Sequence, residues 1–261
     1  MKNPTLQIEK IVDETKDCRS FFFESEKLAQ AQPGQFFMVW VPGVDEFPLA
    51  ASYTSDSDGT FGITVEAVGD GTRALYDSKI GDHIGIRGPY GNGFEITGKN
   101  ILLVCGGRGT IPLALLAENA AKKEIKIDAI LGARSADKLL FKDRLEKATN
   151  VSIATDDGSA GVKGFVTGIA DEMLGKNKYD CVYTCGPEIM MFKLLAICEK
   201  NNVPMQASLE RYMKCGIGIC GSCACGSVRI CKKNVMASSE LKELSAFGTE
   251  KLDKAGRRVK A

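Results

Sequence analysis

Five of the ten cysteines in this chain of 261 residues fall within 17 positions, and their spacing is the strongest chemical signal in the sequence. Cys215, Cys220 and Cys223 form a C-x4-C-x2-C run, and Cys231 follows after seven intervening residues. A C-x4-C-x2-C run with a more distant fourth cysteine is the plant-type ligand pattern of a [2Fe–2S] cluster. The intervening glycines let the chain turn tightly and direct backbone N–H groups at the sulfur atoms. The sequence therefore predicts such a cluster on these four cysteines.

Two other kinds of thiol site compete with this interpretation. A structural zinc site usually shows two C-x2-C pairs, and here only Cys220 and Cys223 form one clearly. A thiol redox pair at the same two residues would leave the other three cysteines unexplained. Cys225 could replace Cys223 or Cys231 as a ligand, but we expect it to be a neighbouring thiol outside the ligand set.

The composition excludes several other classes of chemistry. The 34 basic and 33 acidic side chains give a net charge of +1, which offers no basis for binding nucleic acid or an anionic membrane. The longest apolar runs, such as residues 101–105, are far shorter than the roughly 20 residues of a membrane span. A single histidine, His83, leaves little room for a Ser-His-Asp triad, and we expect it to be structural. With no signal peptide visible, we expect the reducing cytoplasm.

A second chemical signal is a glycine-rich turn between an apolar strand and a helix. Residues 105–112 read Cys-Gly-Gly-Arg-Gly-Thr-Ile-Pro, which lets a diphosphate approach the backbone at a helix start. The turn lacks the full G-x-G-x-x-G spacing, so a tight strand–helix connection is the competing interpretation. Cys185-Gly186-Pro187 after a later strand favours a nucleotide cleft. The acidic turn at residues 156–159 could bind ribose hydroxyls or be an ordinary surface turn.

Segment patterns predict a multidomain protein in three parts. Short β-branched or aromatic segments at 35–41, 61–68 and 80–91, with a helix at 72–76, predict an antiparallel β-barrel within residues 1–97. Within residues 98–204, strands alternate with helices, which predicts a doubly wound parallel α/β sheet. The expected strands are 100–105, 125–132, 151–155 and 179–185, and the expected helices are 111–117, 139–148, 167–174 and 188–201. Residues 205–261 hold the cysteine run and a charged tail with a helix at 238–245.

Taken together, these features resemble the ferredoxin–NADP reductase superfamily, in which a flavin barrel precedes a nicotinamide domain. Within it, the chain is most similar to the iron–sulfur electron-transfer subunits of dihydroorotate dehydrogenase B, and the resemblance covers nearly the whole chain. The segments that carry it are 71–75, 87–94, 106–109, 155–159, 185–187 and 210–216.

The resemblance implies FAD in the barrel, a [2Fe–2S] cluster on the four cysteines, and NAD as the co-substrate of the second domain. The family's flavin motif, Arg-Pro-x-Ser-x-Ser, aligns with residues 47–52, where Phe47 replaces the arginine and Ala50 a serine. The implied FAD-binding residues are Pro48, Leu49, Ala50, Ser52, Thr64, Val65, Glu66, Gly71 and Thr72. The implied NAD-binding residues are Gly106, Gly107, Gly109, Thr110, Asp157, Cys185, Gly186 and Pro187.

The function implied by the resemblance is electron transfer in pyrimidine biosynthesis. A catalytic, FMN-containing dihydroorotate dehydrogenase subunit, in a heterotetramer of two plus two, would supply electrons that pass through [2Fe–2S] and FAD to NAD+. One alternative keeps the cofactors in another complex: an NADH-dependent ferredoxin:NADP oxidoreductase, a cytoplasmic hydrogenase or a sulfite reductase. An alternative of another class is a zinc-stabilised nucleotide-binding interaction module. No side chain is expected to act as a catalytic acid or base, since bound cofactors would supply the chemistry.

Overall fold

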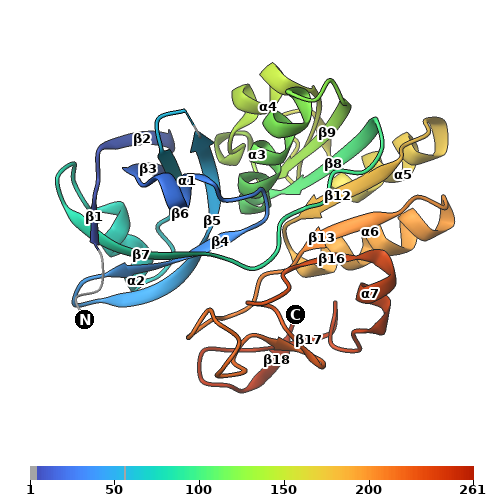
Figure 1. Ribbon diagram of the computed structural model, residues 1–261. Helices are drawn as coiled ribbons and strands as arrows, with labels where there is room; N and C mark the ends of the chain where they lie inside the picture. Colours follow the sequence, from blue (N-terminus) through green and yellow to red (C-terminus); the bar gives the residue numbers. More distant parts are fainter. Residues whose placement is uncertain (1–4, 56) are drawn as a thin grey trace.

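The N-terminal part folds into a strongly curled antiparallel sheet of seven strands. The computed structural model describes residues 5–55 and 57–261 (Figure 1). The strand order is β1-β7-β4-β5-β6-β3-β2, so β4 and β5 lie in the middle of the sheet. The elements are Thr5–Gln7 (β1), Lys10–Thr15 (β2), Cys18–Glu24 (β3), Glu26–Ala29 (α1), Phe36–Val41 (β4), Asp45–Ser55 (β5), Thr60–Glu66 (β6), Asp70–Tyr76 (α2) and His83–Tyr90 (β7). The predicted antiparallel architecture is confirmed, although β1, β2, β3 and β5 were not among the expected strands.

The second part is a doubly wound sheet, as the alternating pattern predicted. Its order is β11-β10-β9-β8-β12-β13-β16, and the strands from β11 to β13 pair in parallel. Helices α3 and α4 cover one face, and α5 and α6 cover the other (Figure 1). The elements are Asn100–Gly106 (β8), Thr110–Ala121 (α3), Lys126–Ala133 (β9), Lys142–Ala148 (α4), Asn150–Thr155 (β10), Val162–Lys163 (β11), Val166–Lys176 (α5), Cys181–Cys185 (β12) and Glu188–Lys200 (α6).

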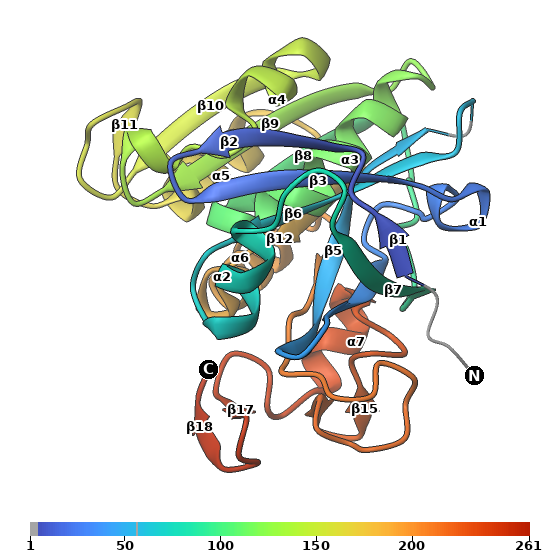
Figure 2. The same cartoon turned by 90° about the vertical axis from the view of Figure 1, so that its left-hand side faces the viewer.

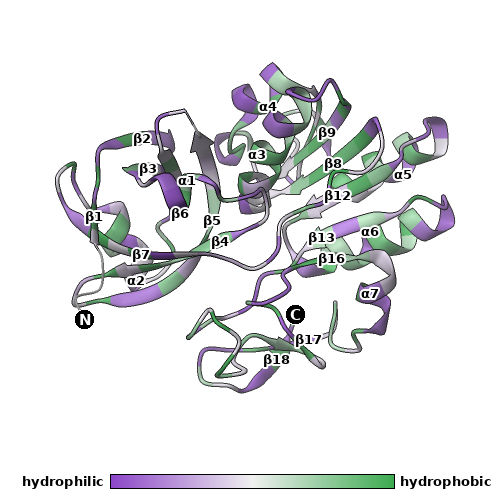
Figure 3. Cartoon of the chain, viewed as in Figure 1, coloured by the Kyte–Doolittle hydropathy of each residue, from purple (hydrophilic) through white to green (hydrophobic). Residues whose placement is uncertain are grey.

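Local sequence explains most of these elements. Strand β8 is covered by helices on both faces, which is why its residues 101–105 are all apolar and fully buried (Figure 3). Pro112 lies in the first turn of α3, where its missing N–H costs no hydrogen bond. Helix α4 begins at Lys142 rather than at the expected residue 139, because Phe141 has the left-handed backbone of φ 58°.

The C-terminal part is not separate from the parallel sheet. Strands Met205–Ser208 (β13) and Val235–Ala237 (β16) extend that sheet, with β16 antiparallel to β13. The predicted boundary at residue 204 therefore lies between two strands of the same sheet, β12 and β13. The remaining elements are Ala224–Cys225 (β14), Val228–Arg229 (β15), Ser238–Glu243 (α7), Glu250–Leu252 (β17) and Arg258–Lys260 (β18). Within residues 5–55 and 57–261, no helix is both long and apolar enough to cross a bilayer.

Two asparagines fasten the C-terminal part to both sheets. Asn92, after β7, exchanges two hydrogen bonds with the backbone of Val235, at 2.8 and 3.0 Å. The buried amide of Asn234 donates to the carbonyl of Gly34 at 2.6 Å and accepts from the N–H of Asn92 at 3.1 Å. Figure 2 shows the result, with the C-terminal segment lying under the curled sheet. Residues 200 positions apart are thereby held together.

We predict that Asn234→Ala lowers the free energy of unfolding by about 1–3 kcal/mol, because it leaves a buried carbonyl and a buried N–H without partners. The measurement is urea denaturation followed by circular dichroism. Lys123→Ala, at an exposed position where the side chain makes no hydrogen bond or ion pair with a described residue, is the control and should change stability by no more than about 0.5 kcal/mol. Equal effects of the two substitutions would contradict the role given to Asn234.

Candidate functional site

The carboxyl ends of two neighbouring parallel strands bring the predicted nucleotide turns together. Strands β8 and β12 pair directly, so Cys105 lies opposite Cys185 and the turns that follow them touch. A Cβ atom at Gly109 would lie 2.0 Å from the carbonyl oxygen of Cys185. Only glycine fits at such a contact. The hydroxyl of Thr110 donates to the carbonyl of Gly107 at 2.7 Å and fixes the start of α3.

Two hollows meet at these turns, and Gly106, Gly107 and Pro187 line both of them. The first is a cavity of about 320 Å³ over the carboxyl ends of the parallel strands. The second is a cleft of about 590 Å³ that lies between this edge and the curled sheet, where Glu66 and Val68 form its far wall. Ligands of open α/β sheets bind at this edge. The arrangement therefore suits a nucleotide that reaches from the cavity toward the curled sheet.

The two aspartates of the acidic turn after β10 have different surroundings. Asp156 lines the smaller cavity, with Lys193 of α6 and the exposed ring of Phe165 also in its wall. Asp157 instead accepts hydrogen bonds from the backbone and hydroxyl of Ser159, at 2.9 and 2.6 Å, and these hydrogen bonds lower its pKa. The sequence pointed to the whole turn, and the prediction named Asp157, because two adjacent aspartates cannot be distinguished by type or spacing.

The residues predicted for FAD lie on three neighbouring elements of the curled sheet. Pro48, Leu49, Ala50 and Ser52 belong to β5, and Ser52 lies where the register with β6 shifts. The hydroxyl of Ser52 is buried and makes no hydrogen bond with any described residue. Such bulges often direct a side chain at a functional site, and an orphaned buried hydroxyl is suited to a bound ligand.

Other members of the predicted FAD set have partners inside the protein. The hydroxyl of Thr64 shares a 2.7 Å hydrogen bond with Ser20, and Val65 is part of the core. The hydroxyl of Thr72 accepts from the backbone of Gly69 at 2.8 Å at the start of α2. Glu66 forms an ion pair with Arg108 across the cleft, at 3.0 Å. Of these four, Glu66 lines the cleft.

Phe47 packs where the related motif has arginine. Its ring lies so close to α2 that a Cβ atom at Gly71 would be 2.8 Å from it. The nearby guanidinium of Arg87 is already committed, because it forms a bidentate pair with Glu46 at 2.6 and 2.8 Å. Arg87 also donates to the carbonyl of Cys215 at 2.9 Å. This arginine therefore ties the first predicted cluster ligand to the flavin side of the molecule.

The four cysteines predicted as ligands lie in one loop and fall into two contacting pairs. The thiol of Cys215 accepts hydrogen bonds from the N–H groups of Ile219 and Cys220, at 3.4 and 3.5 Å. Burial raises its pKa, but these backbone donors outweigh burial and lower the pKa to about 6. The N–H of Cys231 donates to the sulfur of Cys223 at 3.3 Å. Burial, together with the neighbouring thiols of Cys223 and Cys215, raises the pKa of Cys231 to about 12.

Cys225 belongs to neither of these two pairs. It is fully buried, and its sulfur accepts a hydrogen bond from Arg211 at 3.2 Å. Within the described parts of the chain, no three His, Cys, Asp or Glu side chains are arranged as a metal site. The geometry thus shows two pairs of thiols in one loop, with Cys225 of the same segment turned toward Arg211, and without the arrangement of a bound metal.

The five cysteines outside this segment are buried, and one of them, Cys18, also lines the cleft; they are Cys18, Cys105, Cys181, Cys185 and Cys198. Burial raises the pKa of Cys198 to about 12, and it raises the pKa values of Cys105 and Cys185 strongly as well. Buried thiols of this kind are chemically inert. His83 lies exposed at the start of β7, away from both hollows.

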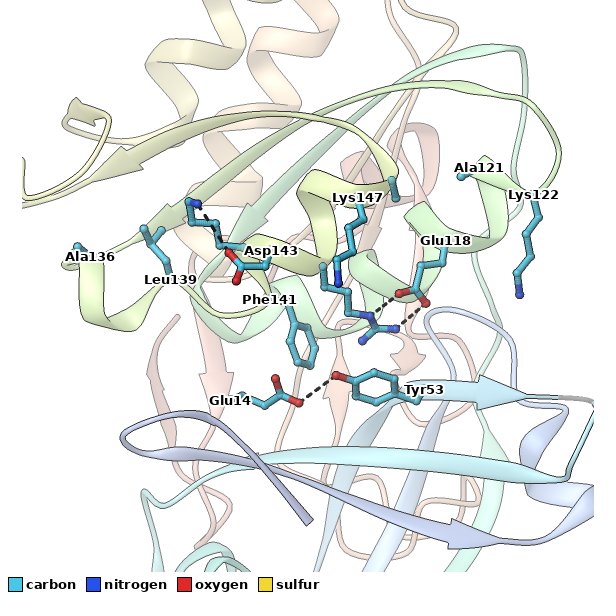
Figure 4. A pocket seen from close by; sticks show the side chains of 13 residues that line it. Glu14, Tyr53, Glu118, Ala121, Lys122, Ala136, Leu139, Phe141, Asp143 and Lys147 are labelled. Atoms are coloured by element: carbon cyan, nitrogen blue, oxygen red, sulfur yellow. Dashed lines mark hydrogen bonds and ion pairs between the residues drawn. The ribbon is translucent and has the colours of Figure 1, made fainter. Parts of the chain in front are cut away.

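A separate and larger pocket of about 910 Å³ lies between the curled sheet and helices α3 and α4 (Figure 4). The guanidinium of Arg144 lies 3.8 Å from the ring centre of Tyr53 and pairs with Glu118 at 2.5 and 2.7 Å. The hydroxyl of Tyr53 donates to Glu14 at 2.9 Å. None of the predicted site residues lines this pocket, and its charged groups mostly satisfy one another.

We predict that Gly109→Ala weakens NADH binding at least tenfold, because the added methyl group forces apart the two turns that form the cleft. Isothermal titration of NADH measures the effect. Gly168→Ala, at a helix position with open space around it, is the control and should leave binding unchanged. Unchanged binding in Gly109→Ala would show that the contact between the turns is not needed.

Comparison with known proteins agrees with this geometry. The sequence model of the oxidoreductase FAD-binding domain matches residues 5–94, and that of the oxidoreductase NAD-binding domain matches residues 103–194. The probable electron transfer subunit of dihydroorotate dehydrogenase B (NAD(+)) from Methanothermobacter thermautotrophicus is 45% identical, over 97% of this chain and 96% of its own. Its counterpart from Methanocaldococcus jannaschii is 43% identical, over 99% of both chains.

Solved structures show the same fold. A chain from an NADH-dependent reduced ferredoxin-NADP oxidoreductase, described for flavin-based electron bifurcation, is 32% identical. It superposes with a TM-score of 0.83 over 93% of this chain and 92% of its own. The ferredoxin reductase of carbazole 1,9a-dioxygenase, at 20% identity and a TM-score of 0.66, shares the fold over 76% of this chain and 65% of its own. The chain therefore belongs to the family of dihydroorotate dehydrogenase B (NAD+) electron transfer subunits, within the FAD- and NAD-binding oxidoreductases.

Proposed function

We propose that this chain carries electrons from an FMN-containing dihydroorotate dehydrogenase subunit to NAD+, with FAD and a [2Fe–2S] cluster as its resident cofactors. The observation that carries the proposal is the position of the four-cysteine loop. Arg87 ties this loop to the flavin side, and Arg211 ties the neighbouring Cys225 to the nucleotide side. When bound, FAD would exchange electron pairs with nicotinamide and single electrons with the cluster. The side chains here bind and position these groups.

The cleft of about 590 Å³, with Glu66 in its wall, supports FAD binding on the flavin side. The unpartnered hydroxyl of Ser52 in β5 is fully buried and does not line this cleft. With Phe47 in place of arginine, no guanidinium at that position is available to the flavin diphosphate. We therefore propose that backbone and hydroxyl groups of β5, β6 and α2 carry most of the binding.

The donor set of the cysteine loop fits a [2Fe–2S] cluster. Iron–sulfur clusters take four thiolates, and their sulfur atoms commonly accept backbone N–H bonds. Cys215 and Cys223 already accept such bonds, and the three glycines between them, Gly216, Gly218 and Gly221, have positive φ angles of 70°, 87° and 74°. The low pKa of Cys215 also favours the thiolate, which is the form that binds iron.

The nicotinamide would bind at the Gly106 and Cys185 turns, with its adenosine part in the smaller cavity. Asp156 offers a carboxylate acceptor for a ribose hydroxyl in this cavity, and Arg134 and Lys193 line the same wall. The NAD(+)-linked relatives, at 45% and 43% identity, support NAD+ as the proposed hydride acceptor.

The surface around the exposed Cys220 supports docking of the catalytic subunit. Ile219 is 72% exposed, and Tyr212 and Ile217 are exposed as well. Apolar side chains beside a redox centre suit a partner that must approach closely. We propose that a catalytic subunit covers this surface, in a heterotetramer of two plus two.

The ten free thiols support a place in the reducing cytoplasm.

A second candidate keeps the cofactors but changes the partner. The likeness to a chain of the NADH-dependent reduced ferredoxin-NADP oxidoreductase, at a TM-score of 0.83, favours this complex among the alternatives.

The experiment that separates the two candidates is co-expression of the tagged protein with the catalytic dihydroorotate dehydrogenase subunit of the same organism. We expect co-purification in equal amounts and NAD+ reduction by dihydroorotate. Co-purification with a ferredoxin-reducing subunit instead would assign the chain to the second complex.

Metal and spectroscopic analysis test the cofactor assignment. We predict that dithionite-reduced wild-type protein shows the electron paramagnetic resonance signal of one [2Fe–2S] cluster. Cys220→Ser should lose more than nine-tenths of this signal and of the bound iron, while Cys225→Ser should retain both. Equal losses in the two variants would contradict the ligand assignment. Zinc without iron or sulfide would support the zinc-stabilised binding module.

A further inference from the structure

Arg211 and Glu188 form a deeply buried ion pair, with side chains only 1% and 7% exposed. The pairing is bidentate: Nη2 of Arg211 lies 2.8 Å from Oε1 of Glu188, and Nη1 contacts Oε2. Desolvating two charges costs about as much as their attraction returns, so a pair of this kind is weak evidence for stability. Stability alone therefore does not explain the pair, and the groups that it contacts on either side are a better guide to its role.

Three distant segments meet at this pair. Glu188 begins helix α6 directly after the Gly186–Pro187 turn and lines the cofactor cleft. Its Oε1 atom also accepts from the N–H of Gly248 in the C-terminal tail, at 2.8 Å. On the other side, Nη2 of Arg211 donates to the sulfur of Cys225 at 3.2 Å. The pair thus links the nucleotide turn to the cysteine segment through a continuous chain of hydrogen bonds.

We infer that Arg211 and Glu188 are positioning residues that couple occupancy of the cysteine loop to nucleotide binding. The inference rests on the proposed cluster. A cluster on Cys223 fixes β14, and β14 carries Cys225. Cys225 then holds Arg211, which orients Glu188 and the turn that precedes it. Without the cluster this support is lost, and the turn binds nucleotide less tightly.

Such coupling must be reciprocal, because binding free energies are linked around a closed cycle. Typical couplings change affinity by about 5- to 150-fold. We therefore expect the dissociation constant for NADH to rise at least fivefold when the cluster is removed from the wild-type chain. At equilibrium, nucleotide should in turn reduce the amount of cluster iron that a competing chelator removes.

The test measures NADH binding by isothermal titration to the cluster-loaded full-length protein and to the same protein stripped with a chelator. The quantity compared is the ratio of the two dissociation constants. In Glu188→Gln and Arg211→Met this ratio should fall to about one, and Arg211→Lys should restore part of it. A purely structural role would lower the melting temperature and weaken both forms equally, leaving the ratio unchanged.

Two further variants guard against loss of folding and against nonspecific charge effects. Cys225→Ala keeps the ion pair and all four proposed ligands. It removes only the contact between the sulfur of Cys225 and Arg211, and it should also reduce the ratio of dissociation constants. Lys242→Met breaks a surface ion pair with Glu199 and should keep the wild-type ratio. Two results would overturn the coupling but not the proposed function. One is a wild-type protein that binds NADH equally well with and without its cluster. The other is a Cys225→Ala variant whose ratio of dissociation constants equals that of the wild type. A wild-type protein that holds no iron or sulfide would overturn both the coupling and the proposed function.

Discussion

The exchange of hydrogen bonds between Asn92, Asn234 and Val235 is the constraint on which the rest of the structure depends. It joins the end of the curled sheet to the strand that closes the parallel sheet, and it does so with amide groups that are largely shielded from water. Because a buried amide loses free energy when its partner is missing, the three parts have one preferred arrangement. The cysteine segment, between residues 209 and 234, is anchored at its far end by this junction and therefore lies against both sheets.

Close backbone approach is the second requirement, and it explains the glycines at the edge of the parallel sheet. Gly109 and Gly186 each lie where a side chain would strike the neighbouring turn. The two turns can share one ligand only because they touch. The buried thiols around them, Cys105 and Cys185, pack like small apolar side chains, and their raised pKa values keep them protonated. Burial alone does not distinguish these thiols from the proposed ligands, because Cys223 and Cys231 are buried as well.

The sequence predicted features that depend on local spacing and missed those that depend on contacts between distant residues. The glycine turn, the alternation of strands and helices and the Cys215–Cys231 spacing are local, and the order of elements follows from them. By contrast, no spacing rule links Glu188 to Arg211 or Arg87 to Cys215, because each pair forms only when the chain has folded. Likewise, spacing could not predict that Asp156 lines the cavity while Asp157 accepts hydrogen bonds from Ser159. Strands β13 and β16 are short, and their place in the sheet is fixed by neighbours rather than by pattern.

The ion pairs that cross the cleft are exposed to solvent, whereas the polar contacts that hold the C-terminal part are buried. Glu66–Arg108 and Asp17–Lys138 bridge the two sheets at the surface, where water screens the charges and each pair contributes about 0–1 kcal/mol. Behind the cleft, Asn234 and the Arg211–Glu188 pair are buried, and breaking either leaves polar groups unsatisfied. The cleft can therefore admit a nucleotide by giving up weak surface pairs, while the cysteine loop keeps its position. An electron-transfer protein needs this division, because its co-substrate must come and go while the sites for its resident cofactors stay in place.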